Sequence, residues 1–428
     1  MQIEAAICAF CGCLCDDIVL TIESDRIVQA KNACALGKAW YTAHSRPPDL
    51  PAARVDGKSV EVEEAIEAAA ILLTKARYPI LYGLSSTSCE AQRHAVALAE
   101  ALGGCIDCCT SVCHGPSGMA VQGFGEPTCT LGEVKNRADL VIYWGSNPAE
   151  SHPRHMSRYA VTSKGRLTPN GRKNRTVVLV DVRSTPSSRF ADLLLTVRPG
   201  IDFEILWALR ALVLGRKVEP AGLAETGITL AQLTHLAELM KNCRYGVLFA
   251  GQGLTQSAGN QMNLSAAILL VRDLNQFTKF AIIPMRGHGN VTGVDQVLTW
   301  QTGYPFGVNF SRGYPRFNPG EFTMVDVLRR KEADAVLSVA SDPAASLPAE
   351  AVQRLTEVPL IAIDTHESET TRLARVSFMA STVGIRASGT AYRMDNVPLF
   401  LKQALTSIYP SDEEILGRLL ERVRELKA

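Results

Sequence analysis

The run LVIYWG, residues 140–145, is short, almost wholly apolar and closed by a glycine. Such a run suits a strand buried on both faces, as in a parallel sheet between layers of helices. Segments with helical spacing of apolar residues, such as Val62–Ala76 and Glu90–Leu102, alternate with runs of this kind, which predicts an α/β fold. The other predicted strands are Pro79–Gly83, Thr176–Val182, Gly246–Gly251, Phe280–Pro284, Ala335–Ala340 and Pro359–Asp364.

Glycines and polar residues follow several of these predicted strands. In open parallel sheets, nucleotides bind in the crevice beyond the carboxyl ends of the strands. One glycine turn is weak support for such a crevice, but five in one chain predict at least two nucleotide-type crevices. The turns contain Gly145 with Asn147, Asp181, Gly251 with Gly253, Asp342, and Asp364 with His366.

The charge balance argues against two classes of partner. The chain has 428 residues and a formal net charge of +1, from 44 Lys and Arg against 43 Asp and Glu. We therefore predict no binding to nucleic acid or to an anionic membrane. The sequence has no apolar run of about 18 residues and no basic segment of a signal peptide at its start. We expect a cytoplasmic protein, in a reducing compartment where clustered cysteines more often bind metal than form disulfides.

Four of the twelve cysteines open the chain with the spacing Cys8-x2-Cys11-x3-Cys15-x18-Cys34. Iron–sulfur clusters need about four thiolates, commonly three on a tight loop and one farther away. A tetrahedral zinc ion would also accept four thiolates, but its usual pattern has two CxxC pairs and this segment has one. The spacing therefore favours an iron–sulfur site with zinc as the alternative, and it gives no role to the additional thiol of Cys13.

A second group of cysteines ends in Cys113-His114-Gly115. The glycines and the proline of this segment predict a bent loop. The Cys113 thiolate suits a soft, redox-active metal, and His114 could move a proton beside it. A packed loop cysteine with a capping histidine explains these residues equally well. The cysteines predicted to pack in the core are Cys105, Cys108, Cys109 and Cys129.

Two polar segments follow predicted strands at some distance from the cysteines. Arg286-Gly287-His288-Gly289-Asn290 could hold an anion or steer a proton. His152-Pro153-Arg154-His155 also follows a strand end. Taken alone, each segment is predicted to be a surface loop.

The chain is long enough for two or three domains. Residues 1–50 are rich in turns, with a short strand pair at Ile18–Ile22 and Arg26–Gln29, and Arg46-Pro47-Pro48 indicates a boundary. We predict an iron–sulfur module at residues 1–50, a discontinuous α/β domain at 51–137 and 310–428, and a second Rossmann-like parallel-sheet domain at 138–309.

Together, these segments resemble the molybdenum- or tungsten-bispterin oxidoreductases, and most closely the B-subunit family of formylmethanofuran dehydrogenases. The likeness runs along nearly the whole chain. The stretches that carry it are CAFCGCLCDDI (8–18), NACALG (32–37), TSVCHGPS (110–117), GEVKNRADLVIYWGSNP (132–148), HPRHMSR (152–158), IPMRGHGNVTG (283–293), FNPGE (317–321) and GTAYRMDNVP (389–398).

The resemblance implies a metal site and a cluster site. Cys113 would bind molybdenum or tungsten, between which the sequence does not choose. His114 and Arg286, with His288 nearby, would line the open face of that metal and handle protons and formate. The ligands of a 4Fe–4S cluster would be Cys8, Cys11, Cys15 and Cys34. The residues at the two pterin guanine dinucleotides would be Gly145, Asn147, Asp181 and Asp342, with Gly251 and Gly253 in the neighbouring glycine turn.

The resemblance also implies a reaction and partners. The reaction would be the two-electron interconversion of carbon dioxide and formate. In the family, an amidohydrolase-like subunit joins formate to the amine of methanofuran, and a small subunit supplies the last pterin-binding domain. A glutamate-synthase-like subunit would complete the complex. The fold implied is that of the bispterin enzymes without their C-terminal barrel domain.

A few positions depart from the family pattern. Arg386 and Ser388 stand where acidic residues are expected, and Val182 stands where a proline usually follows the aspartate. These departures support an alternative, in which the chain is a non-redox structural subunit of a bacterial formyltransferase/hydrolase complex that releases formate.

Overall fold

The computed structural model describes residues 1–46 and 49–428, so Pro47 and Pro48 of the predicted boundary lie outside the described residues. The chain forms two compact units. Unit 1 comprises Met1–Ser111, His288–Arg393 and Pro398–Ala428, and unit 2 comprises Val112–Gly287 with Met394–Val397. Each unit has its own sheet with parallel strands, which confirms the α/β prediction. The three-part domain assignment made from the sequence stays a prediction.

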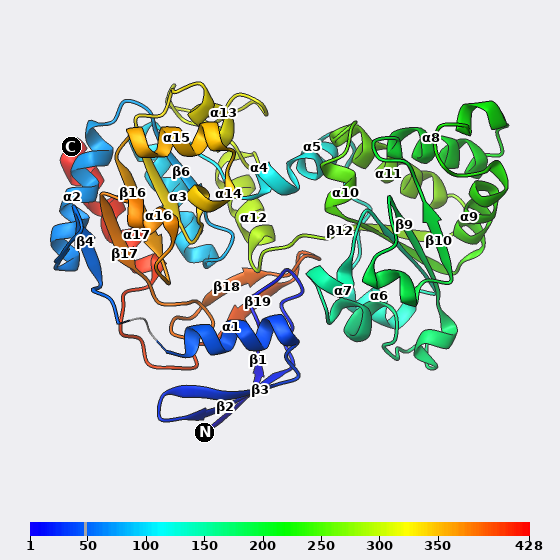
Figure 1. Ribbon diagram of the computed structural model, residues 1–428, viewed down its shortest axis with the longest axis horizontal. Helices are drawn as coiled ribbons and strands as arrows, with labels where there is room; N and C mark the ends of the chain where they lie inside the picture. The colour runs from blue at the N-terminus through cyan, green and yellow to red at the C-terminus, as the bar shows by residue number, and fades with distance from the viewer. Residues whose placement is uncertain (47–48) are drawn as a thin grey trace. The chain divides into compact units, whose positions relative to one another are not determined.

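Unit 1 begins with a small antiparallel sheet that carries the cysteine segment between its first two strands (Figure 1). Its strands are β1 (Gln2–Ala6), β2 (Ile18–Glu23) and β3 (Arg26–Lys31). Ile18, Leu20 and Ile22 of β2 are buried, because alternate residues of a strand point to the same face. Helix α1 (Ala35–Ser45) packs against β3.

The main sheet of unit 1 has nine strands in the order β14-β13-β7-β6-β15-β16-β17-β4-β5. The five central strands, β7 to β17 in this order, are parallel, and the outer strands are antiparallel. All residues of β6, β15, β16 and β17 are buried, as expected for strands covered on both faces. The strands are β4 (Ala53–Val55), β5 (Lys58–Val60), β6 (Pro79–Gly83), β7 (Cys105–Ile106), β13 (Val308–Asn309), β14 (Arg316–Phe317), β15 (Ala335–Val339), β16 (Leu360–Asp364) and β17 (Val376–Met379); a separate hairpin has β18 (Gly389–Tyr392) and β19 (Pro398–Leu401).

Helix α17 of unit 1 packs on both α2 and α3. Helix α17 begins at a capping box formed by Ser411 and Glu414, and its apolar face, including Leu416 and Leu420, is buried. The other helices of the unit are α2 (Val62–Lys75), α3 (Cys89–Leu102), α12 (Val291–Thr302), α13 (Met324–Arg329), α14 (Pro343–Ser346), α15 (Ala349–Glu357) and α16 (Glu369–Leu373), with α17 at Asp412–Lys427.

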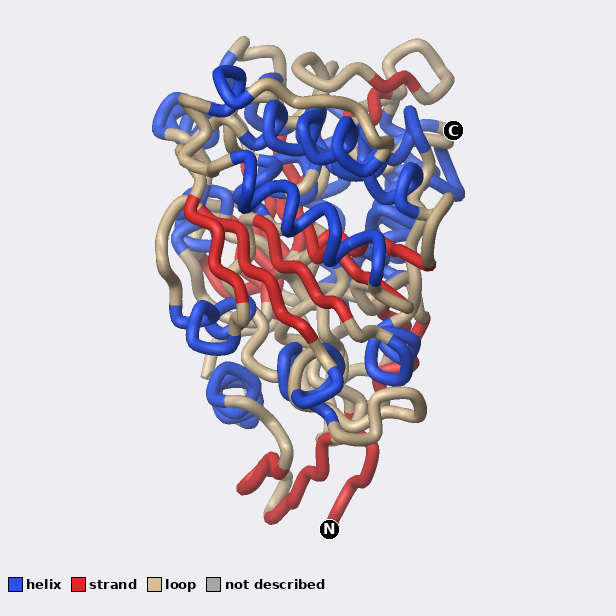
Figure 2. Tube along the Cα trace, turned by 90° about the vertical axis from the view of Figure 1, so that its right-hand side faces the viewer, coloured by secondary structure: helices blue, strands red, loops and turns tan. Residues whose placement is uncertain are grey.

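Unit 2 has a five-stranded sheet in the order β10-β9-β8-β11-β12, and all its neighbouring strands are parallel. Figure 2 shows strands that run side by side with helices alongside them. Leu140, Ile142 and Trp144 of β8 join one core cluster with residues of α8, α9 and α11. The strands are β8 (Leu140–Trp144), β9 (Thr176–Asp181), β10 (Leu193–Thr196), β11 (Tyr245–Ala250) and β12 (Lys279–Pro284).

The helices of unit 2 cover both faces of this sheet (Figure 1). The α-helices are α5 (Gly115–Phe124), α6 (Leu131–Arg137), α7 (Pro148–Ser151), α8 (Asp202–Val213), α9 (Leu230–Asn242), α10 (Gln252–Thr255) and α11 (Gln261–Leu274). Shorter helical turns are η1 (Met156–Ala160), η2 (Gly171–Asn174), η3 (Pro186–Phe190) and η4 (Pro220–Leu223). Helix α4 (Thr110–Cys113) contains the residue pair at which the two units divide. No helix within residues 1–46 and 49–428 is both long and apolar enough to cross a membrane.

Candidate functional site

The cysteine segment of unit 1 folds back on itself. The Cys8 amide donates to the Cys15 carbonyl at 3.0 Å, and the Leu14 amide donates to the Cys11 carbonyl at 3.0 Å. Leu14 is fully buried and has φ 36°, a conformation that a leucine adopts only when its surroundings hold it there. The loop therefore brings Cys8 and Cys15 together by its backbone, without help from a disulfide.

Helix α1 adds the fourth cysteine. Cys34 is the N-cap residue of α1, and its Sγ accepts from the Gly37 amide at 3.4 Å. Gly37 faces two of the sulfurs: a Cβ placed there would lie 3.0 Å from Cys8 Sγ and 3.8 Å from Cys34 Sγ. The missing side chain thus leaves space between thiols from two segments. Gly37 was not among the predicted site residues, although its position three residues after a cysteine at a helix start marks it.

The neighbouring thiols act electrostatically on that of Cys8. Burial raises the pKa of the Cys8 thiol well above its usual value, and the nearby thiols of Cys11, Cys15 and Cys34 raise it further. Cys13, which had no assigned role, hydrogen-bonds to Cys11, and that bond lowers the pKa of Cys11. A buried thiol whose ionisation is opposed by neighbouring thiols is a group that a positively charged iron core would stabilise as a thiolate. The donor set therefore fits an iron–sulfur cluster.

No group of three or more His, Cys, Asp or Glu side chains in the described part of the chain forms a ready site for a metal ion.

The loop after β12 reaches the cysteine segment inside unit 1. His288 forms an isolated antiparallel bridge with Cys11. A Cβ at Gly289 would overlap the Ala9 carbonyl oxygen, so this close approach of two backbones requires glycine. His288 itself is exposed, whereas Gly289 and Asn290 are buried.

In unit 2, Cys113 ends α4 and α5 begins at Gly115. The predicted bent loop is therefore wrong: a single non-helical residue, His114, separates two helices, because Pro116 is tolerated in the first turn of α5. The Cys113 carbonyl accepts from Thr255 Oγ1 at 2.7 Å and from Gln256 Nε2 at 3.0 Å. These two bonds fix the backbone that carries the thiol.

The ring of His114 is buried and held at both nitrogens. Nε2 lies 3.1 Å from the Met285 carbonyl oxygen, and Nδ1 lies 3.2 Å from Ser117 Oγ. A carbonyl only accepts, so Nε2 carries the proton and Nδ1 accepts from the serine hydroxyl. Burial, and then the charge of Arg286, lower the pKa of His114 to about 3.

His152 and His155 also lie inside unit 2, and the prediction that their segment is a surface loop is wrong. Both rings are buried. His152 Nε2 donates to the Arg286 carbonyl at 2.8 Å, and the Tyr143 hydroxyl lies 3.0 Å from His155 Nδ1. The segment Arg286–Asn290, predicted as a second surface loop, is exposed only at Gly287 and His288. By contrast, the prediction that Cys105, Cys108, Cys109 and Cys129 are core residues is confirmed.

Three glycines join the ends of β8 and β11. Gly145 has φ 58°, and a Cβ there would lie 2.9 Å from Gly253 Cα. A Cβ at Gly251 would overlap the Gly145 carbonyl, which itself accepts from the Gly253 amide at 2.9 Å. These glycines therefore allow two strand-end turns to touch, a packing role that sequence reasoning had not assigned to them.

Asn147 and Asp181 follow β8 and β9. Asn147 Oδ1 accepts from Ser187 Oγ at 2.7 Å, and Ser187 Oγ accepts from the Ala149 amide at 3.0 Å. Asp181 Oδ1 accepts from the Val182 amide at 2.7 Å. Burial raises the pKa of Asp181.

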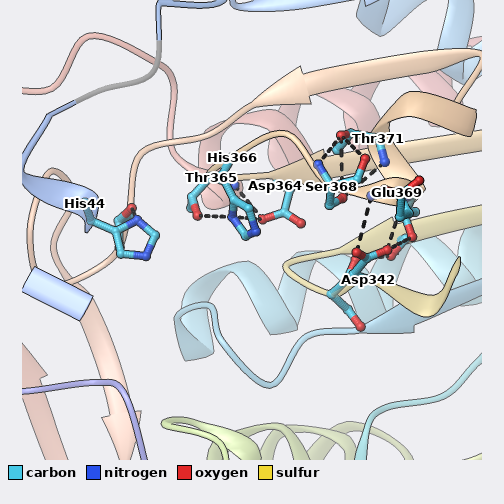
Figure 3. Close-up of polar contacts among 12 residues, drawn as sticks. His44, Asp342, Asp364, Thr365, His366, Ser368, Glu369 and Thr371 are labelled. Carbon is cyan, nitrogen blue, oxygen red and sulfur yellow. Dashed lines mark hydrogen bonds and ion pairs between the residues drawn. The ribbon is translucent and has the colours of Figure 1, made fainter. Parts of the chain in front are cut away.

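Asp342 and Asp364 occupy corresponding strand ends in unit 1 (Figure 3). Asp342 Oδ1 accepts from Thr370 Oγ1 at 2.6 Å and from the Thr370 amide at 3.0 Å. Asp364 Oδ1 accepts from the Thr365 amide at 2.7 Å and pairs with His366 Nδ1 at 3.3 Å. The hydrogen bond to Asp364 raises the pKa of His366.

A pocket of about 450 Å³ opens in unit 1 beyond the carboxyl ends of β16 and β17. Its polar lining includes His44, Thr365, His366 and Arg386. The His44 and His366 rings are 6.4 Å apart between centroids, and both are drawn in Figure 3. The pocket lies where open parallel sheets hold nucleotide ligands.

Comparison with known proteins identifies the family of the chain. The molybdopterin oxidoreductase family matches residues 61–287. The chain is 46% identical, over 433 residues, to the B subunit of the tungsten-containing formylmethanofuran dehydrogenase 2 of Methanocaldococcus jannaschii, and the match covers 99% of each protein. A chain of the formyltransferase/hydrolase complex of Methylorubrum extorquens, solved with methylofuran, is 25% identical with a TM-score of 0.71, covering 88% of this chain and 99% of that one. Acetylene hydratase of Pelobacter acetylenicus shares the fold, with a TM-score of 0.74 at 11% identity over 99% of this chain and 70% of that one.

Proposed function

The chain belongs to the B-subunit family of formylmethanofuran dehydrogenases, within the molybdopterin oxidoreductases, and from this premise we propose that it interconverts carbon dioxide and formate on a molybdenum or tungsten bis(pterin guanine dinucleotide). It is an oxidoreductase subunit. The observation that carries the proposal is that three further thiols, from the loop after β1 and the start of α1, lie near enough to the buried Cys8 thiol to raise its pKa. When bound, the metal–pterin group supplies the two-electron chemistry.

The proposed iron–sulfur module uses Cys8, Cys11, Cys15 and Cys34 as ligands. Supporting this, the Gly37 amide donates to the Cys34 sulfur, and the absent side chain of Gly37 leaves room beside Cys8. Burial of the loop keeps water away from sulfur atoms, which is one of the factors that sets cluster potentials. Zinc bound by the same thiols remains the alternative, and metal analysis distinguishes it from an iron–sulfur cluster.

The proposed active-site residues are Cys113, His114, Arg286 and His288. Cys113 would bind the metal through its sulfur, while Thr255 and Gln256 hold its carbonyl. His114, which donates to Met285, would keep the backbone before Arg286 in place. The Arg286 guanidinium is the natural partner of a carboxylate such as formate, and His288 would exchange protons near it.

The proposed dinucleotide contacts lie at strand ends in both units. In unit 2 they are Gly145, Asn147, Asp181, Gly251 and Gly253, where glycines allow a close approach of backbone to ligand. In unit 1 they centre on Asp342, in the same strand-end region as the pocket lined by His366. Position beyond the carboxyl ends of parallel strands supports both assignments.

The proposed partners are an amidohydrolase-like subunit, a glutamate-synthase-like subunit and a small pterin-binding subunit. The related Methylorubrum chain belongs to a formyltransferase/hydrolase complex, which supports assembly of this chain with other subunits. We also propose a cytoplasmic location, and an iron–sulfur module at residues 1–50 followed by domains at 51–137 with 310–428 and at 138–309.

Metal analysis tests the proposal. The chain, purified without oxygen together with the subunits that accompany it, should contain about four irons per chain for the site described here and about one molybdenum or tungsten. The same complex with Cys11→Ser and Cys34→Ser in this chain gives the iron content of the accompanying subunits. Subtracting that value leaves the iron held by this chain. Absence of both metals from this chain would overturn the proposal.

A second candidate is the non-redox scaffold, and the similarity to the formyltransferase/hydrolase chain favours considering it. Cys113→Ala separates the two functions, because only the oxidoreductase uses that sulfur. We expect formate oxidation to fall by at least about 100-fold, as for loss of groups that hold a catalytic metal. Cys243→Ala is the matched control: it removes a half-buried thiol that contacts Met240 and should leave activity unchanged. Unchanged formate production in the Cys113→Ala complex would support the scaffold.

A further inference from the structure

We propose that the Tyr41 hydroxyl donates a hydrogen bond to a sulfur atom of the iron–sulfur site and raises the reduction potential of the cluster. This inference rests on the cluster proposed above. Tyr41 lies on α1, seven residues after Cys34. Seven residues are close to two helical turns, so Tyr41 and the cysteine at the helix start lie on the same face.

The Tyr41 hydroxyl is buried and has no hydrogen-bond partner in the described part of the chain. The residue is 1% exposed, and its hydroxyl oxygen has no hydrogen-bond partner among residues 1–46 and 49–428. Buried hydroxyls are almost always paired, because a buried polar group without a partner costs folding free energy. An unpaired hydroxyl here indicates a partner that the polypeptide alone does not supply.

The neighbours of this hydroxyl identify that partner. Burial raises the pKa of Tyr41 well above its usual value, and the next contributions are the charges of Cys8 and Cys15. Two of the proposed cluster ligands therefore act electrostatically on this buried, unpaired hydroxyl. A neutral thiol is a weak acceptor, whereas a thiolate bound to iron or a cluster sulfide carries negative charge and accepts strongly.

The surroundings hold the ring in place. The Trp40 and Tyr41 rings meet edge to face with centroids 4.8 Å apart. The backbone already gives one donor to this site, from the Gly37 amide to Cys34. Tyr41 would add a side-chain donor on the side of Cys8 and Cys15. The two donors come from the same helix and would serve different sulfurs.

The effect on the cluster follows from charge. One-electron reduction makes the cluster more negative, so a hydrogen-bond donor stabilises the reduced state more than the oxidised state. Tyr41→Phe keeps the ring and removes only the donor. At the solution potential where half of the wild-type cluster is reduced, the variant should show a several-fold lower ratio of reduced to oxidised cluster. The largest expected decrease in this ratio is about tenfold, which corresponds to a midpoint potential lower by about 59 mV for one electron.

The experiment uses the full chain with its cluster assembled without oxygen, titrated with dithionite and followed by electron paramagnetic resonance. Tyr78→Phe is the matched control. The Tyr78 hydroxyl also lies beside a thiol of unit 1, that of Cys105, but this cysteine is not a proposed cluster ligand. We expect a more negative midpoint for Tyr41→Phe and an unchanged midpoint for Tyr78→Phe.

Each result has a distinct meaning. Iron-loaded Tyr41→Phe with the wild-type midpoint overturns the inference and leaves the proposed function intact. A wild-type chain that never binds iron overturns the cluster, and the inference with it. If Tyr41→Phe does not retain iron, wild-type chain made with 3-fluorotyrosine replaces it, since the more acidic hydroxyl is a stronger donor. Its midpoint should become less negative, and an unchanged value overturns the inference.

Discussion

The strand ends of the two units are built alike but carry different charges. After β8 the chain has Gly145 at φ 58° and Asn147 at φ −116°, ψ 75°, and after β15 it has Ala340 at φ 48° and Asp342 at φ −113°, ψ 75°. A four-residue helix with proline in its first turn follows each.

The matching extends to the short helical segments that follow the neighbouring strands, η3 after β9 and α16 after β16. Ser187 Oγ contacts Asn147 Oδ1 and accepts from the Ala149 amide. Thr370 Oγ1 contacts Asp342 Oδ1 and accepts from the Ala344 amide, with the same 3.0 Å distance for the amide bond. The two turns differ in charge: the unit 1 turn has the carboxylate of Asp342 where the unit 2 turn has the amide of Asn147.

A second difference lies two residues after the aspartate that ends each neighbouring strand. Arg183 follows Asp181 in unit 2, and His366 follows Asp364 in unit 1. One unit thus has a permanent cation at this position and the other has a titratable one. The comparison teaches that the same backbone arrangement at two strand ends can carry side chains of different charge.

The largest expected difference between the units concerns the residue with positive φ. Gly145→Ala should lower the free energy of unfolding by about 3 kcal/mol, because its Cβ would meet Gly253 in a left-handed backbone. Ala340→Gly, the reverse change in unit 1, should stay within about 1 kcal/mol of the wild type. Urea denaturation of the two variants measures both values. Equal losses would break the comparison.

The next largest effect concerns the carboxylate. Asp342→Ala should cost about 2 kcal/mol, because two Thr370 donors at the start of α16 lose their acceptor. Asn147→Ala, which leaves the Ser187 hydroxyl without its acceptor and removes an exposed donor to Glu150, should cost about 1 kcal/mol. Asp342→Asn retains an acceptor oxygen and serves as the control, with an intermediate loss in the same denaturation series. A larger loss for Asn147→Ala would contradict this order.

The smallest effect concerns pH and is confined to unit 1. The pKa of His366 is raised by its hydrogen bond to Asp364 and by the charge of Asp342, while the His44 ring faces it without a fixed charge. The stabilisation from the pair is therefore complete below the unfolded pKa of histidine and is lost as pH rises through the higher folded pKa. Because His366 is largely exposed, the amount is at most about 0.5 kcal/mol.

NMR titration of the His366 ring checks the direction of this shift. Asp364→Asn should return the pKa of His366 toward its ordinary value, since the carboxylate is the first cause of the shift. An unchanged pKa in that variant would show that Asp364 is not the partner that matters. The Arg183 position of unit 2 should give no stability change across the same pH range, because arginine stays charged.

Local sequence patterns were enough to predict most of the strands. The apolar runs at 79–83, 140–145 and 335–340 form β6, β8 and β15, since a strand buried on both faces needs only continuous apolar residues. The strand pair around Ser24-Asp25 also formed as predicted, as β2 and β3.

Contacts between distant residues were not predictable in the same way. The approach of Gly289 to Ala9 joins residues 280 positions apart, and no local pattern marks it. The burial of His152 and His155 depends on a sheet face that only the folded unit supplies. Arg386, which looked like a departure in a cofactor loop, is buried and donates to Asp25 and to the Ser45 carbonyl. Its role in unit 1 is structural.

These bonds of Arg386 have a consequence for biogenesis. The β2–β3 turn, at Asp25, receives hydrogen bonds from Arg386 and from the Thr406 amide. These bonds join Asp25 to residues 361 and 381 positions further along the chain, so this turn can complete its hydrogen bonds only after those residues have been synthesised.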